Sequence, residues 1–287
     1  MADGVSPLVQ RRRLKAELRR ARLEMGLTQE QVASDMEWSL SKIIRIEGGS
    51  TGVSANDLKA LLNLYKITDS VRTDQLTALA RASRERSWWS AYRDVAPPTL
   101  IQLIEYESAA SAVLQFENML VPGILQTQDY ARAVLQDYYT DKLSSERVVG
   151  KLVDLRVRRE ELLDRKNSPR FTFILDEAVV RRVVGGNLVM VTQIQRLIEA
   201  AKKPNIAIEI VPFKAGMHPG TGGPFEVVEF ADAMADVVFL ESPRTDIVSD
   251  DPEETLRYRE IFGQLRKLAL TGQDSLACLK EISAEMK

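Results

Sequence analysis

The chain contains very few of the residues that form disulfides or bind metals. Among its 287 residues there is one cysteine, Cys278, and one histidine, His218. A single cysteine cannot form a disulfide within the chain, and these two residues cannot build a Cys/His metal cluster. The sequence therefore predicts no internal disulfide, no zinc or other metal site, and no cofactor.

Long hydrophobic runs are also missing. No stretch of about 18 apolar residues is available to span a bilayer, and the N-terminal "MADGVSPLVQRRR" lacks the apolar core of a signal peptide. We therefore expect a cytoplasmic protein with no membrane partner. The composition, 45% hydrophobic and 28% charged, is that of an ordinary globular protein, and the length allows two domains with their own cores.

Charge is distributed unevenly along the chain. The chain has 39 Lys+Arg and 41 Asp+Glu residues. Residues 1–86 contain 15 Lys+Arg and 11 Asp+Glu, a net charge of +4, and the remainder contains 24 Lys+Arg and 30 Asp+Glu, a net charge of −6. Seven cations occur in "QRRRLKAELRRAR", residues 10–22. Such a run is compatible with the solvated face of an amphipathic helix or with a nucleic-acid contact, and charge alone does not separate the two.

The stretch "LTQEQVASDMEWSLSKIIRIEGGS", residues 27–50, has the pattern of two short helices joined by a tight turn. Thr28 and Gln31 have the spacing of a capping box, and Ser39 is a good N-cap for a second helix. Gly48 and the glycine after it mark the end of that helix. The pattern predicts a helix-turn-helix.

The outward face of the second helix carries side chains that can read DNA. Lys42 lies in the first turn of this helix, where a positive charge is unfavourable against the helix dipole in water. Beside a phosphate the same charge is favourable. Ser41 can bond a base edge, Leu40 can touch a thymine methyl, and Arg45 can reach guanine or the backbone. The predicted contacts to double-stranded DNA are Gln29, Ser39, Leu40, Ser41, Lys42 and Arg45.

These residues resemble the xenobiotic-response-element (XRE) family of helix-turn-helix regulators, in the phrases Leu-Thr-Gln-Glu, Ser-x-Ser and Ile-x-x-Ile-Glu-x-Gly. The resemblance implies an all-α N-terminal domain, residues 1–86, with five helices at 8–25, 28–36, 39–47, 54–63 and 69–86. It also implies a structural ion pair between Arg22 and Glu47. Glu37 stands where the family usually has glycine, so we expect a backbone cost of about 1 kcal/mol if the position keeps a positive φ.

After a predicted linker at residues 87–100, residues 101–287 alternate helical and β-branched patterns. This indicates an α+β domain with a mostly antiparallel sheet. Expected helices lie at 105–120, 127–139, 145–166, 189–203 and 253–270, and expected strands at 170–176, 206–213, 224–231 and 235–242. The apolar stripe Val148, Leu152, Leu155 and Leu162 suits packing against another helix, either in a homodimer or within its own domain.

This second region resembles the uncharacterised C-terminal domain of actinobacterial regulators of the WhiJ type, in phrases such as "LVPGILQTQDYARAVL" and "DEAVVRRVVGG". Members of that group have been described as antitoxin-like, with a small partner protein encoded nearby. The resemblance implies a transcriptional regulator, of the repressor kind, whose C-terminal domain senses a small-molecule effector or a small protein partner and supports a homodimer. The alternative is an antitoxin-like, DNA-docked adaptor that neutralises a small partner protein.

A third possibility, an enzyme with a DNA-binding leader, lacks a catalytic pattern. The loop "AGMHPGTGGPFE" places His218 among glycines but has no lysine for a phosphate-binding loop. Asp176 and Glu177 stand at a strand-to-helix junction, where carboxylates commonly cap helices, and Cys278 has no partner pattern. We therefore predict no enzyme and no catalytic residue. The glycine loop is either a turn into the strand at Phe225 or a contact for a small molecule or partner.

Overall fold

The computed structural model describes residues 7–48, 52–84, 87–138, 146–231, 235–241 and 246–287. Its contacts divide the chain into two compact units, Met1–Ser90 and Ala91–Lys287. Each unit has its own hydrophobic core, so each is described by itself.

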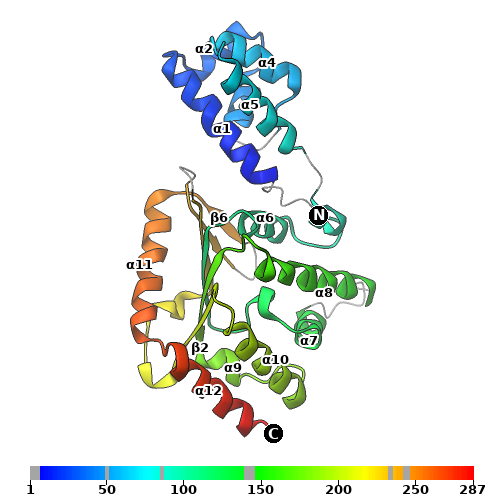
Figure 1. Cartoon of the computed structure of the whole chain (residues 1–287), viewed down its shortest axis with the longest axis vertical. Helices are drawn as coiled ribbons and strands as arrows, with labels where there is room; N and C mark the ends of the chain where they lie inside the picture. The colour runs from blue at the N-terminus through cyan, green and yellow to red at the C-terminus, as the bar shows by residue number, and fades with distance from the viewer. Residues whose placement is uncertain (1–6, 49–51, 85–86, 139–145, 232–234, 242–245) are drawn as a thin grey trace. The chain divides into compact units, whose positions relative to one another are not determined.

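The N-terminal unit is all-helical, as expected (Figure 1). Its helices are α1 (Pro7–Glu24), α2 (Gln29–Asp35), α3 (Leu40–Gly48), α4 (Ala55–Leu64) and α5 (Ser70–Ala82). Apolar residues three and four positions apart on each helix form one core, which includes Leu14, Leu18, Val32, Ile43, Ile46, Leu58, Leu61 and Leu76. This unit confirms the helical pattern predicted for it.

Side-chain caps fix where three of these helices begin. At α2 the predicted capping box is present, because Thr28 accepts from the Gln31 amide and Gln31 accepts from the Thr28 amide. Ser54 accepts from the Asp57 amide at α4, and Asp69 accepts from the Arg72 amide at α5. Each cap satisfies an amide that the helix itself leaves without a partner.

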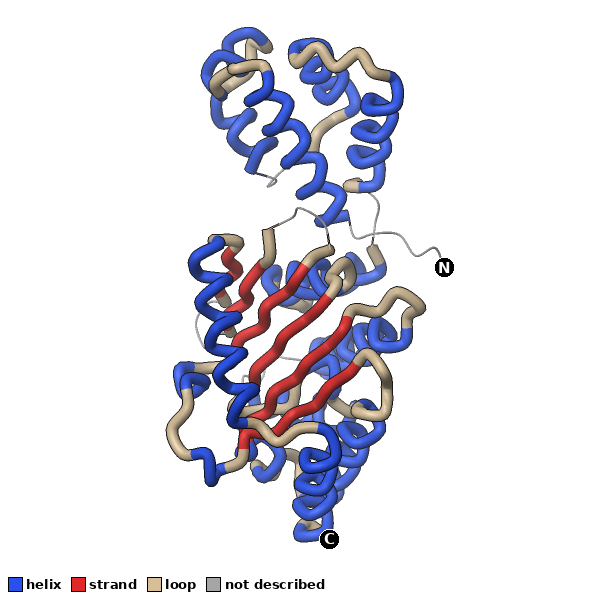
Figure 2. The backbone as a smooth tube through the Cα atoms, turned by 60° about the vertical axis from the view of Figure 1, so that its left-hand side comes forward, coloured by secondary structure: helices blue, strands red, loops and turns tan. Residues whose placement is uncertain are grey.

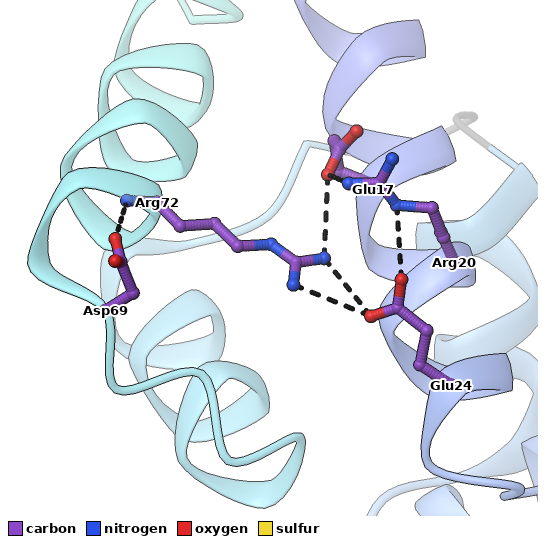
Figure 3. Close-up of polar contacts among 5 residues, drawn as sticks. All are labelled: Glu17, Arg20, Glu24, Asp69 and Arg72. Atoms are coloured by element: carbon purple, nitrogen blue, oxygen red, sulfur yellow. Dashed lines mark hydrogen bonds and ion pairs between the residues drawn. The ribbon is translucent and has the colours of Figure 1, made fainter.

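A cluster of charged side chains joins α1 to α5 (Figure 3). The Arg72 guanidinium of α5 lies 3.4 Å from Glu24 and 3.7 Å from Glu17, both on α1. Arg20 bridges the same two carboxylates, at 2.8 Å from Glu17 and 3.5 Å from Glu24. These side chains are partly exposed, so the cluster orients the two helices while the core beneath supplies most of the stability.

Residues 87–100, predicted as a linker, contain the 3₁₀ helix Trp88–Tyr92 and the first residues of α6 (Pro98–Glu107). From Ala91 onward they belong to the second unit. The Tyr92 hydroxyl donates to Asp154 of α8 (Glu146–Glu160), and Lys151 of the same helix lies 2.7 Å from Asp94. The end of the predicted linker is therefore attached to the C-terminal fold.

The C-terminal unit is built on a six-stranded mixed sheet of order β3-β2-β1-β4-β5-β6. Its strands are β1 (Ala112–Glu117), β2 (Arg170–Asp176), β3 (Ile206–Val211), β4 (Phe225–Glu229), β5 (Val237–Leu240) and β6 (Ile247–Ser249). The pairings of β1 with β2 and β2 with β3 are parallel, and the other three are antiparallel. The predicted α+β class with a mostly antiparallel sheet is confirmed.

Helices cover both faces of this sheet (Figure 2). On one face, α11 (Pro252–Leu268) packs Phe262 and Leu265 against a layer that includes Phe116 and Phe225. The other face carries α7 (Gln128–Tyr138), α10 (Asn187–Ala200) and α12 (Gly272–Glu285), with α9 (Glu177–Arg181) directly after β2. Because both faces are buried, the strands have near-continuous apolar sequences.

The expectation of a single helix over residues 105–120 is wrong. Helix α6 ends at Glu107 and β1 begins at Ala112, where it becomes an inner strand paired with β2 and with β4. Val113 and Phe116 are fully buried on opposite faces of that strand. A strand buried on both faces loses the alternating pattern by which sequence separates it from a helix. Strand β6 and helix α12 were also not anticipated.

The predicted apolar stripe, which runs along α8 and into the 3₁₀ helix Glu161–Asp164, is buried within its own unit. The exposed fractions of Leu152, Leu155 and Leu162 are 3%, 1% and 4%, and Val148 is half-buried. The second of the two alternatives is therefore correct. This stripe is not available as the seam of a dimer.

The glycine loop that follows β3 is tied to the ends of the parallel strands. His218 Nε2 lies 2.9 Å from Asp176 Oδ2 at the end of β2, and the Asn118 amide donates to the Gly220 carbonyl at 3.3 Å. A Cβ added to Gly220 would stand 2.4 Å from the ring of Phe116. The backbone of the loop therefore lies directly on the central strand, a position that only glycine can occupy without displacing the ring.

We predict that Gly220→Ala lowers the free energy of unfolding by about 1–3 kcal/mol, the range for overpacking a filled core. Gly222→Ala is the matched control, because a Cβ there meets nothing within 4 Å. Denaturant unfolding of both variants measures the difference. Equal stability of the two variants would show that the loop yields at Gly220 without cost.

Candidate nucleic-acid interface

The turn between α2 and α3 is closed by backbone hydrogen bonds. The Trp38 amide donates to the Ala33 carbonyl at 2.8 Å and the Glu37 amide to the Ser34 carbonyl at 3.1 Å, a Schellman arrangement. This arrangement needs a left-handed residue, and Glu37 has a φ of 53°. A glutamate thus occupies a glycine-type conformation, at a cost of about 1 kcal/mol. The turn keeps its geometry because the core beneath it holds both helices.

Helix α3 presents a mixed polar and apolar face to solvent. Ile43 and Ile46 point into the core, with exposed fractions of 1% and 5%. The predicted DNA-contacting residues Ser39, Leu40, Ser41 and Arg45 are all exposed, as is Ile44 between them. Arg45 stands one helical turn after Ser41, so the two share one side of the helix. This face has the chemistry of a base-reading surface.

Lys42 is engaged within the unit. Its ammonium lies 2.8 Å from Asp57 Oδ1 in the first turn of α4, and 3.5 Å from the centroid of the Trp38 ring. Burial alone would raise the pKa of Asp57, but hydrogen bonds from Lys42 and Ser54 outweigh it and hold that pKa below its ordinary value. Asp57 thus compensates the unfavourable position of Lys42 at a helix N-terminus. The pairing was not predicted, because its two residues lie on different helices.

Arg22 and Glu47 form a buried ion pair within the unit. The Arg22 guanidinium donates twice to the Glu47 carboxylate, at 2.7 and 3.0 Å, and once to the Leu27 carbonyl at 2.7 Å. Gln29, another predicted DNA contact, donates its side-chain amide to Glu47 at 2.8 Å. Burial together with the nearby Glu47 charge raises the pKa of Tyr65 to about 12. The group therefore joins α1, α3 and the start of α2.

Much of the basic run in α1 serves internal contacts. Lys15 donates to the Gly48 carbonyl at 3.3 Å, where a cation complements the C-terminal end of α3. Arg11 reaches the Ser83 carbonyl at 3.5 Å, Arg20 binds Glu17, and Arg22 binds Glu47. Three of these four cations therefore hold α1 against its neighbours, while the bond of Arg20 to Glu17 lies within α1. The cap made by Lys15 was not anticipated, because nothing in the local sequence connects residues so far apart.

We predict that Glu47→Gln lowers the free energy of unfolding of the N-terminal unit by about 3 kcal/mol, because Arg22 keeps a buried charge without its partner. Glu24→Gln is the control, since its side chain is 52% exposed and its pair with Arg72 contributes at most about 1 kcal/mol. Hydrogen exchange of the Ile43 and Leu61 amides reports on this unit. A stable Glu47→Gln protein with altered DNA affinity would place Glu47 at the DNA surface instead.

The candidate residues of the C-terminal unit are arranged as structural groups. Asp176 caps α9 through the Ala178 amide and also meets His218, while Glu177 accepts from the Phe213 amide and from Arg181. Burial raises the pKa of the Cys278 thiol, which opposes formation of a reactive thiolate. Each of these side chains therefore has a structural explanation: a cap, a loop anchor or a packed thiol.

Comparison with protein families matches both units of the chain. A family described as "Domain of unknown function (DUF5753)" matches residues 100–281, and one described as "Helix-turn-helix domain" matches residues 13–76. No curated protein and no solved structure matches the chain. In the part of the chain that the structure describes, no helix is both long enough and apolar enough to cross a membrane.

Proposed function

Since the chain belongs to the family of the domain of unknown function DUF5753, here preceded by a helix-turn-helix domain, we propose that it is a sequence-specific transcriptional regulator of the repressor type. The helix-turn-helix match supports a DNA-binding regulator rather than an enzyme. The observation that carries the finer proposal is the exposed face of α3, with Ser41 and Arg45 on one side. Because its partner is DNA, the protein is proposed to act in the cytoplasm.

Within this proposal the predicted DNA contacts have different roles. Ser41, Leu40 and Arg45 are exposed and are proposed to read bases in the major groove, with Ser39 beside them. The Gln29 side chain is bonded to Glu47, and the Lys42 side chain is bonded to Asp57. These two side chains therefore position α2 and α3, and each can bind a phosphate only by giving up its present hydrogen bond. At the start of α2 the Gln31 amide is already bonded to the Thr28 hydroxyl, so a phosphate is proposed to approach only the amides that precede it.

We predict that Arg45→Ala weakens operator binding by about 1–3 kcal/mol and reduces the salt dependence by about one unit of slope if Arg45 contacts a phosphate. Arg81→Ala, an exposed cation in the last turn of α5, is the control for a change of charge alone. The operator is first identified by genome-wide footprinting and then titrated at several salt concentrations. Equal affinities of wild type and Arg45→Ala would remove α3 as the reading helix.

We further propose a homodimer, because one helix-turn-helix unit reads a single half-site and useful affinity needs two units about 34 Å apart. The predicted apolar stripe is buried, so the seam is proposed to lie on another surface. Sedimentation of the full chain, of 32.2 kDa, should give twice that mass at micromolar concentration. A single-chain mass, in the presence and absence of operator, would contradict the dimer.

The C-terminal domain is proposed to sense a small-molecule effector or a small protein partner. The alternative is an antitoxin-like adaptor that neutralises a small protein while docked on DNA. The two differ in what the domain binds, so capture of partners from cells, combined with the footprint, separates them. A regulator changes its footprint when its small-molecule effector or its small protein partner is bound, whereas an adaptor co-purifies with a protein at a fixed ratio and keeps its footprint.

A further inference from the structure

The sheet face opposite α11 carries a buried group of polar side chains. Gln115 and Glu117 lie two residues apart on β1, and Glu226 of β4 is the register partner of Gln115, so all three share that face. Glu107 from α6 and Arg159 from α8 complete the group. None of the five is more than 7% exposed, and Glu107 and Glu226 are 0% and 1% exposed. We call these five residues the acidic centre.

The hydrogen bonds of the acidic centre leave several acceptors unused. Arg159 donates to both oxygens of Glu107, at 2.6 and 2.5 Å, and the Gln115 amide nitrogen donates to Glu117 at 2.8 Å. Both carboxylate oxygens of Glu226 and the amide oxygen of Gln115 are buried without a hydrogen-bond partner. Buried polar atoms normally have partners, because an unsatisfied one costs about 1–3 kcal/mol.

The charges of the acidic centre are also unbalanced. Its three carboxylates face one guanidinium, and Arg159 is already bound to Glu107. Burial, and then the negative charge of Glu107, raise the pKa of Glu226 well above its ordinary value. Burial and the charge of Glu241 do the same to the pKa of Glu117. Glu241 is an exposed residue that interacts with Glu117, so acidic side chains continue from buried Glu226 through Glu117 to the surface.

We infer that the acidic centre binds an organic cation with N–H donors, an ammonium or guanidinium group, between Glu226 and Gln115. Such a group supplies the charge and the donors that the unused oxygens need. No group of three or more His, Cys, Asp or Glu side chains among the described residues is arranged to hold a metal ion, which favours an organic cation. The competing arrangement is a proton on Glu226 donated to Glu107, which requires no ligand.

This inference deepens the proposed function, on which it rests for its regulatory meaning, because it assigns a chemical class to the effector. Binding of the cation to the domain does not itself require DNA. The two claims therefore fail separately. If the protein binds its operator but no cation, this inference alone is wrong. If it binds the cation but no operator, the regulatory role alone is wrong.

The test uses the full chain and calorimetric titration with two probes, agmatine and n-butylammonium. Tetramethylammonium, a cation without N–H donors, and n-butylurea, a neutral donor, are the controls at equal ionic strength. At least one probe should bind and raise the melting temperature, while both controls should do neither. Failure of both probes to bind more tightly than tetramethylammonium would overturn the inference.

Variants then assign the site. Glu226→Gln should weaken probe binding at least about tenfold, because it removes the charge and one acceptor at constant size. Glu199→Gln, which removes an exposed carboxylate on α10, should bind like wild type. If Glu226→Gln does not fold, probe binding by Glu117→Gln and the comparison of probes and controls on the wild type take its place. Unchanged probe binding by a folded Glu226→Gln variant contradicts the site. The site is also contradicted if the wild type binds neither probe and Glu226→Gln has a higher melting temperature than the wild type.

Discussion

The buried pair of Arg22 and Glu47 is the interaction on which the proposed DNA-reading surface depends. Its two charges lie inside the N-terminal unit, so each needs the other and neither can shift without exposing a bare charge to the core. The pair fixes α3 against α1, and the Leu27 carbonyl and the Gln29 amide are bonded to the same group. The orientation of the outward face of α3 therefore follows from an interaction on its inner side.

The same unit shows why net charge is a poor guide to a binding surface. The excess of cations in residues 1–86 left a solvated helix face and a nucleic-acid contact both open, and the structure shows Lys15, Arg20, Arg22 and Lys42 bound to carbonyls or carboxylates. The electrostatic field that a binding partner experiences is the one that remains after these cations have paired with carbonyls and carboxylates. For DNA recognition, the position of Arg45 beside Ser41 is therefore more informative than the number of cations in α1.

Local chemistry made the N-terminal unit predictable from its sequence. The caps at Thr28 and Ser54 and the apolar spacing of Ile43 and Ile46 each depend on neighbours within one helical turn. The C-terminal unit was predictable in class, but β1 was mistaken for helix because it is buried on both faces. Contacts such as Lys42 with Asp57 and Lys15 with Gly48 link different helices. No pattern along the chain encodes them, and they decide which candidate side chains face solvent.

The central position of β1 also has a consequence for how the chain acquires its structure. Its partners are β2, which begins at Arg170, and β4, which ends at Glu229, so these strands pair only after long intervening segments of chain, which include helices, have been synthesised. Contacts so distant in sequence form slowly, whereas the helical contacts of the N-terminal unit are local. During synthesis the N-terminal unit is therefore expected to fold first. The edge of β1 that pairs with β2 waits for about a third of the remaining chain, and the edge that pairs with β4 waits for about two thirds of it. An unpaired strand edge is prone to aggregation during this interval.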